Sequence, residues 1–118
     1  MSLEETEAAS AAVAKNPDGR VKLADIENAI EATMYFSPSD AKTAEVIPSA
    51  GADVTHMLAA LRNMTLCVLV MRNGFVIVGK SAPLDPANFN AELGRKFAYE
   101  DAIRQLWPLM AFARAENK

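Results

Sequence analysis

The densest apolar pattern in the chain lies between residues 64 and 78. Two runs rich in Val, Leu and Ile flank Asn73 and Gly74, the dipeptide most typical of a two-residue β-hairpin. The expected type I′ turn needs positive φ at both residues, which Asn tolerates and Gly adopts without steric cost. Because both runs are apolar at nearly every position, we expect both faces of the hairpin to be covered, one by a helix and the other by a second subunit.

A long amphipathic helix is predicted after the hairpin. Asp85 suits the N-cap, with Pro86 at the first helical position. Two apolar stripes follow at helical spacing, which indicates a helix buried on two sides. The first stripe contains Phe89, Leu93, Phe97, Ala98, Ala102 and Leu106, and the second contains Tyr99, Ile103, Trp107 and Met110. Pro108 removes one backbone hydrogen bond, so we expect a kink or break between residues 104 and 107.

Helical spacing is also present upstream of the hairpin. Apolar residues recur in this way at Leu23, Ile26, Ile30 and Met34. The pattern predicts an amphipathic helix of about twelve residues within residues 21–36. Ser37, followed by Pro38 and Asp40, has the chemistry of a helix start and predicts a short helix to about residue 44. Residues 45–53 have the composition of a linker, and residues 54–61 suit one or two helical turns.

The N-terminal segment has helix propensity but little to bury. Residues 2–16 are rich in Ala and Glu, and residues 16–19 have turn chemistry. We therefore expect residues 1–19 to be a flexible or partner-stabilised arm, and residues 20–118 to be a single α+β domain. The predicted fold has an N-terminal amphipathic helix, a two-stranded antiparallel β-hairpin, and a long C-terminal helix packed on the hairpin and kinked near Pro108.

Composition narrows the class of protein. The chain has 118 residues, of which 51% are hydrophobic, so it can build one core. A net charge of −3 does not favour nucleic acid or an anionic membrane. No apolar run approaches the roughly 20 residues of a membrane span, and the acidic N-terminus lacks the features of a secretory signal. We expect a soluble protein of a reducing cytoplasm.

Candidate chemistry is sparse. Cys67 is the single cysteine, which excludes a disulfide framework within the chain and a multi-cysteine metal site, and its apolar surroundings favour a buried, inert thiol. His56 is the single histidine, and no nucleophile elbow or phosphate-binding glycine loop accompanies it. We expect no catalytic residue, metal or cofactor. Gly94, inside the predicted helix, indicates close approach of another element more readily than a ligand contact.

The polar face of the predicted long helix is the one candidate site. It supplies Asn88, Arg95, Lys96 and Arg104, with Lys80 at the end of the second strand. One interpretation is an ordinary solvated face, because Glu92 and Glu100 lie four residues before Lys96 and Arg104 in the favourable order. The other is a site for an anionic ligand, because Arg suits bidentate phosphate contacts and an oligomer can gather such residues from two chains.

Several motifs in this region resemble one protein family. They are Asn73-Gly74-Phe75, Gly79, Ser81-Ala82, Pro86 to Ala91, Glu92 to Lys96, Ala98, Ala102 and Trp107-Pro108-Leu109. Together they are similar to the phage gene-49/gene-66 family of tailed phages and prophages, over about residues 20–36 and 64–114. The resemblance implies a phage or prophage origin and an accessory role in the cytoplasm of the host bacterium. It implies no particular activity.

The motif residues combine turn chemistry, helix packing and a charged helix face, which favours a binding or assembly module over an enzyme. The leading expectation is a homo-oligomer, a dimer or higher, that binds a host component. A nucleotide-type anionic signal is one form of that component. The alternative is an adaptor or inhibitor of a host enzyme that uses the second apolar face of the long helix. Nucleic-acid binding is third, since the chain is acidic.

Overall fold

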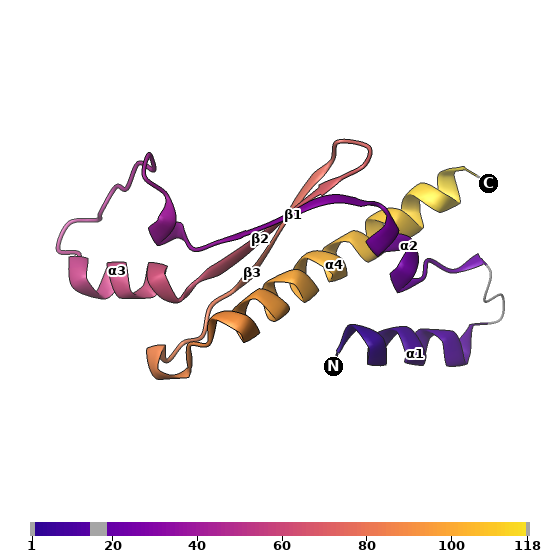
Figure 1. Ribbon diagram of the computed structural model, residues 1–118, viewed down its shortest axis with the longest axis horizontal. Helices are drawn as coiled ribbons and strands as arrows, with labels where there is room; N and C mark the ends of the chain where they lie inside the picture. The colour runs from indigo at the N-terminus through magenta and orange to yellow at the C-terminus, as the bar shows by residue number, and fades with distance from the viewer. Residues whose placement is uncertain (1, 15–18, 118) are drawn as a thin grey trace.

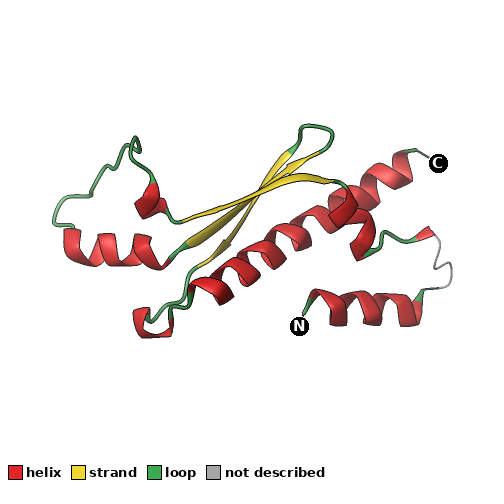
Figure 2. Ribbon diagram, in the orientation of Figure 1, coloured by secondary structure: helices red, strands yellow, loops and turns green. Residues whose placement is uncertain are grey.

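The computed structural model describes residues 2–14 and 19–117 and has an α+β fold, as expected. A three-stranded antiparallel sheet lies along one long helix, with shorter helices at both ends (Figures 1 and 2). The elements, with η for a short 3-10 helix, are α1 (Leu3–Val13), α2 (Leu23–Asn28), β1 (Ile30–Phe36), η2 (Pro38–Asp40), α3 (Val54–Asn63), β2 (Thr65–Met71), β3 (Val76–Ser81), η3 (Pro86–Asn88) and α4 (Ala91–Glu116).

The sheet has three strands rather than the two predicted, because the expected helix over residues 21–36 is wrong in its second half. Helix α2 ends at Asn28, and β1 pairs antiparallel with β2 along the side that β3 leaves free. The segment contains β-branched and aromatic residues such as Thr33, Tyr35 and Phe36, which suit a strand. Their spacing fits either structure, and pairing with β2, distant in sequence, decided between them.

The hairpin turn is in the expected place but is not of type I′. Gly74 has a φ of 88°, whereas Asn73 does not have positive φ. The Gly74 N–H donates to the Met71 carbonyl, and the Met71 N–H donates to the Phe75 carbonyl, both at 2.8 Å. This is a three-residue loop that ends in a left-handed glycine, the next most common hairpin connection. The Asn73 side chain accepts a bond from the Phe75 N–H at 2.9 Å and stabilises the loop.

Substitution of Gly74 tests this turn. No atom lies within 4 Å of a Cβ built at this position, so Gly74→Ala should lose only the free energy of forcing alanine to positive φ. We expect a loss of about 1 kcal/mol in the free energy of unfolding, measured by urea titration. Gly74→Asn is the matched control and should retain more stability, because Asn tolerates the left-handed region. Equal stability of Gly74→Ala and the native chain would contradict the assignment.

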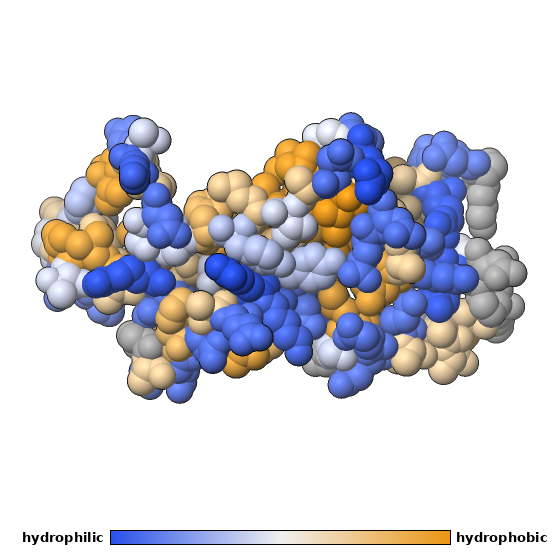
Figure 3. Space-filling model, viewed as in Figure 1, coloured by the Kyte–Doolittle hydropathy of each residue, from blue (hydrophilic) through white to orange (hydrophobic). Residues whose placement is uncertain are grey.

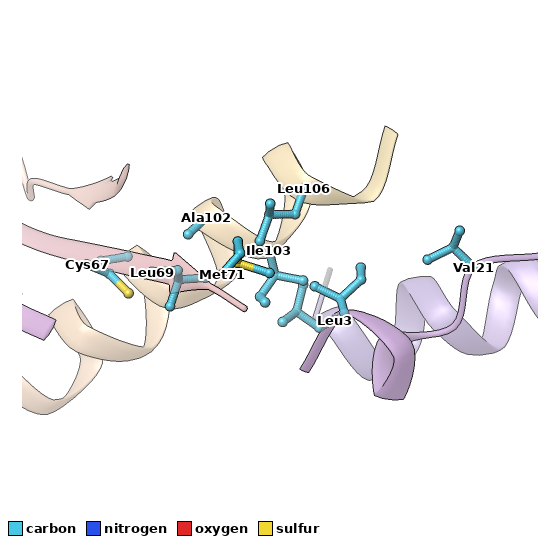
Figure 4. Packing of buried hydrophobic residues seen from close by; sticks show 10 residues of the cluster. Leu3, Val21, Cys67, Leu69, Met71, Ala102, Ile103 and Leu106 are labelled. Atoms are coloured by element: carbon cyan, nitrogen blue, oxygen red, sulfur yellow. The ribbon is translucent and has the colours of Figure 1, made fainter. Parts of the chain in front are cut away.

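Helix α4 covers one face of the sheet. Along β2 the residues alternate between buried and half-buried, and the buried set faces the helix. In Figure 4, Leu69 and Met71 of β2 lie beside Ala102 and Ile103 of α4. The buried core consists of Leu3, Val21, Ile26, Cys67, Leu69, Met71, Ala98, Ala102, Ile103 and Leu106. Gly79 of β3 is also buried against α4, so strand and helix approach closely at that point.

The start of α4 differs from the prediction. The helix begins at Ala91, where the Asn90 side chain accepts a hydrogen bond from the Leu93 N–H at 3.1 Å. Asp85 instead caps the short η3 turn by accepting from the Ala87 N–H at 3.0 Å. The helix continues to Glu116 with Pro108 inside it, and the kink near Pro108 stays a prediction.

The N-terminal segment is joined to the C-terminal half of α4 by hydrogen bonds. The Trp107 indole N–H donates to the Val21 carbonyl at 3.0 Å, and Arg114 donates to the Arg20 carbonyl at 2.7 Å. The Glu7 carboxylate of α1 forms an ion pair with Arg20 at 3.1 Å. The turn expected at residues 16–19 lies largely outside the described residues. That residues 1–19 form a flexible or partner-stabilised arm stays a prediction.

The molecule is elongated. Its principal extents are 55 × 29 × 24 Å and its radius of gyration is 17.5 Å. A compact domain of this length would have a radius of gyration of about 13.5 Å. Helix α3 contributes to the extension because it lies beyond the end of the sheet (Figure 1) and has no buried residue.

Candidate functional site

A small hollow lies at the end of the sheet where β1, η2 and the start of α4 meet. Its volume is about 190 Å³. The residues that line it are Tyr35, Phe36, Ser37, Asp40, Thr65, Phe89, Ala91 and Arg95. Three of these have aromatic rings and one has a guanidinium group. The hollow therefore combines flat apolar surfaces with a positive charge.

Two of the lining residues, Arg95 and Tyr35, contact each other. The Arg95 guanidinium carbon lies 5.8 Å from the centroid of the Tyr35 ring, within the range of a cation–π interaction. Tyr35 lies opposite Cys67 in the sheet, on the face that α4 covers. Burial raises the pKa of the Tyr35 hydroxyl, with a smaller contribution from Cys67, so the ring stays neutral at physiological pH. A neutral ring beside a guanidinium group suits recognition of a planar anionic ligand.

A second positive charge lies in another hollow that Phe89 also lines. Arg62 and Asn63, at the end of α3, line an adjoining open hollow together with Ala59 and Phe89. Helix α3 is held there by Ser37, whose hydroxyl donates to the Leu61 carbonyl at 2.8 Å. Ser37 also caps η2, as its sequence context predicts. The Ser-Pro-Ser-Asp segment thus places both α3 and the wall of the first hollow.

Negative charge is also present at the rim. The Asp40 carboxylate lines the first hollow and accepts a hydrogen bond from the Ser37 N–H at 3.0 Å. An anionic group in the site would be repelled from this side and attracted towards Arg95. The arrangement therefore favours a ligand whose planar part packs on the rings and whose charged part lies towards the arginines.

The structure separates most of the residues that the sequence suggested for ligand binding. Arg95 lines the first hollow, and Asn88 lines a different hollow beside Phe89. Lys80 lies opposite Leu66 in the sheet, on the face away from α4. Lys96 is exposed on α4, one residue beyond Arg95. Arg104 is exposed nine residues after Arg95, which is about 13 Å along the helix and half a turn around it.

Within one chain, then, only Asn88 and Arg95 of these five flank Phe89. The turn residues Asn73 and Gly74 lie at the opposite end of the sheet. Tyr35 and Arg62 were not among the site residues predicted from the sequence. The signal for Tyr35 was the strand character of residues 33–36, which the helical spacing of the same segment obscured.

Other chemistry is limited in the described part of the chain. No group of three or more His, Cys, Asp or Glu residues there is placed to hold a metal ion. Cys67 is buried, and this burial raises the pKa of its thiol to about 11, consistent with the expected inert thiol. His56 lies on the exposed helix α3. Among the described helices, none is both long and apolar enough to cross a membrane.

Comparison with known proteins identifies the family. No curated protein and no solved structure matches the chain. Residues 21–117 match the family described as phage protein (N4 Gp49/phage Sf6 gene 66). The match includes the sheet, α4 and both arginines beside Phe89, and it agrees with the resemblance seen in the sequence motifs. The chain belongs to this family of phage proteins.

Proposed function

We propose that this protein is a phage accessory protein that binds a ligand without transforming it, as a homo-oligomer in the cytoplasm of the host cell. The ligand is a nucleotide-type anion, and the hollow of Tyr35, Phe89 and Arg95 is its site. The observation that carries the proposal is the Arg95 guanidinium placed over the Tyr35 ring beside a second aromatic side chain. Such pairs offer stacking to a base and a cation to a phosphate.

The size of the site supports a ligand that extends past the first hollow. A volume of about 190 Å³ is below the roughly 300–1,000 Å³ typical of small-molecule sites. The open hollow that Phe89 also lines provides further room and a second cation, Arg62. A base packed against Tyr35 would have its phosphates near Arg95, and a longer ligand would reach Arg62 in the adjoining hollow. A second chain that closes the open side would complete the enclosure.

Isothermal titration against a panel of cyclic nucleotides and ADP-ribose derivatives tests the proposal. We expect one member of the panel to bind, and Arg95→Gln to weaken that binding at least about tenfold, because a charge-assisted contact is worth about 1.5–3 kcal/mol. Arg104→Gln is the matched control, since it removes the same charge from another side of the same helix and should change affinity little. If the folded native protein binds no member of the panel, the nucleotide proposal is contradicted.

One observation favours the alternative, an adaptor that binds a host enzyme. Leu93 and Phe97 are 46% and 50% exposed on α4. With Pro83 and Phe89 they line a hollow of about 290 Å³. Apolar side chains exposed on a helix are common at protein–protein contacts. Two results together would favour this function over ligand binding: capture of one host protein in stoichiometric amount from a lysate, and no binding to any member of the ligand panel.

A further inference from the structure

The sheet face that points away from α4 is almost entirely apolar. Because side chains alternate along a strand, the cross-strand register assigns nine residues to this open face. They are Ala32, Met34 and Phe36 of β1, Leu66, Val68 and Val70 of β2, and Val76, Val78 and Lys80 of β3. Lys80, at one end, is the single charged member. Met34, Val76 and Val78 are 59%, 52% and 46% exposed, so no described residue of the chain covers them fully.

This composition is unusual for a sheet with one face in water. In such sheets, polar and apolar residues alternate along each strand, with the polar side chains facing water and the apolar ones facing the core. Here all the outward positions except Lys80 are apolar instead. A continuous patch of this kind marks a surface that is covered in the functional state.

We propose that the open face packs against the open face of a second copy of this chain. The inference rests on the oligomeric part of the proposed function and specifies its interface. In a two-fold symmetric dimer the same surface of both chains meets, so that surface must be complementary to itself. A nearly uncharged apolar face meets this requirement because it has few charges that need an opposite charge on the partner. The elongated shape agrees, since a radius of gyration of 17.5 Å is large for one self-sufficient domain of this length.

The area of the open face is sufficient for the centre of a dimer interface. Three strands about 4.8 Å apart, two of seven residues and one of six, at about 3.3 Å per residue give a footprint of roughly 320 Å². A stable interface buries about 800 Å² per partner, so neighbouring segments must supply the rim. Helix α3 and the segment before it expose Val46, Ile47, Val54 and Leu58. Hydrophobic surface is visible over this end of the molecule in Figure 3.

Assembly through the edge of β3 is disfavoured because α4 already satisfies that edge. The Lys80 N–H donates to the Asp101 carboxylate at 2.9 Å. The Val78 carbonyl accepts a hydrogen bond from the Gln105 side chain at 2.9 Å. These side chains occupy groups that would otherwise pair with another strand. The face of the sheet, rather than this edge, is therefore the surface offered to a partner.

Sedimentation equilibrium of the full chain, from 1 to 200 μM, tests the inference. The native protein should have at least twice the 12.7 kDa mass of one chain. Val78→Glu should weaken association at least about 100-fold, because it places an unpaired charge in an apolar contact. Met34→Gln, a milder change on the edge strand β1, should weaken it about tenfold. Thr33→Glu is the control: Thr33 is the exposed neighbour of Met34 on the other face and should leave the mass unchanged.

Circular dichroism of each variant establishes that it is folded, and Met34→Gln provides the test if Val78→Glu does not fold. A monomeric native protein would overturn both this inference and the oligomeric part of the proposed function. If the native protein is an oligomer and neither open-face variant weakens it, this inference alone would be overturned. That result is expected if the chains instead assemble through the edge of β1. Isothermal titration against the ligand panel tests the ligand-binding proposal independently of these association measurements.

Discussion

Gly79→Ala is expected to lower the free energy of unfolding by at least about 3 kcal/mol. A Cβ on Gly79 would lie 2.6 Å from the Ala102 backbone nitrogen and 2.8 Å from the Ala102 Cβ, and would also meet the Ala98 carbonyl oxygen. These atoms belong to the interior of α4 and cannot rotate away. Helix and sheet must therefore separate, which loosens the contacts between β2 and α4 and exceeds the usual 1–3 kcal/mol for an overpacked core.

Gly94→Ala is the matched control for this prediction. Its Cβ would lie 2.6 Å from the Thr65 hydroxyl oxygen, a side-chain atom that can shift more readily than the α4 backbone that faces Gly79. Alanine also has a higher helix propensity than glycine, by up to about 1 kcal/mol, which partly offsets the crowding. Urea titration should show a clearly smaller loss of stability for Gly94→Ala than for Gly79→Ala. Similar losses in the two variants would contradict a rigid contact between β3 and α4 at Gly79.

Leu69→Ala should lower the free energy of unfolding by about 2–5 kcal/mol, the range for a large side chain removed from a packed core. Leu69 is fully buried at the middle of the central strand. Its neighbours across the sheet are Thr33 and Ile77, and α4 packs on the same face of the sheet. Because Leu69 is enclosed in this way, the surrounding structure cannot easily fill the cavity that alanine would leave.

Leu84→Ala is the control, because it removes the same atoms from a leucine that is fully exposed. Its effect should be within about 0.5 kcal/mol of zero. Thermal unfolding followed by circular dichroism, with both variants at the same protein concentration, measures the difference. A loss below about 1 kcal/mol for Leu69→Ala would show that Leu69 is not in the centre of the core.

Local sequence was sufficient to predict much of the C-terminal half. The runs on each side of Asn73 and Gly74 form the hairpin, and the periodic segment after it forms α4. Gly94 does mark a close approach, to Thr65 of β2. The exact helix start was wrong because Asp85 and Asn90 are both competent caps. A choice between two caps depends on where the chain must turn to reach the sheet.

The candidate site was less accessible from sequence. Arg95 and Asn88 were identified by charge and helical position, and both lie beside Phe89. The role of Tyr35 depended on a strand that helical periodicity concealed. The place of Arg62 depended on the position of α3, to which the Ser37–Leu61 hydrogen bond contributes. Each of these contacts joins segments distant in sequence, and no local pattern reports on them.

The sequence by itself determined the hairpin and the place of its turn, the long helix, the capping chemistry at Ser37, and membership of a phage protein family. These follow from interactions between residues near one another in the chain, or from motifs. Only the tertiary structure decided that residues 30–36 form a strand, and hence that Tyr35 lies beneath Arg95. The reason is physical: the segment's spacing suits a helix and its residue types suit a strand, and the unpaired edge of β2 supplied the hydrogen bonds that made the strand more stable.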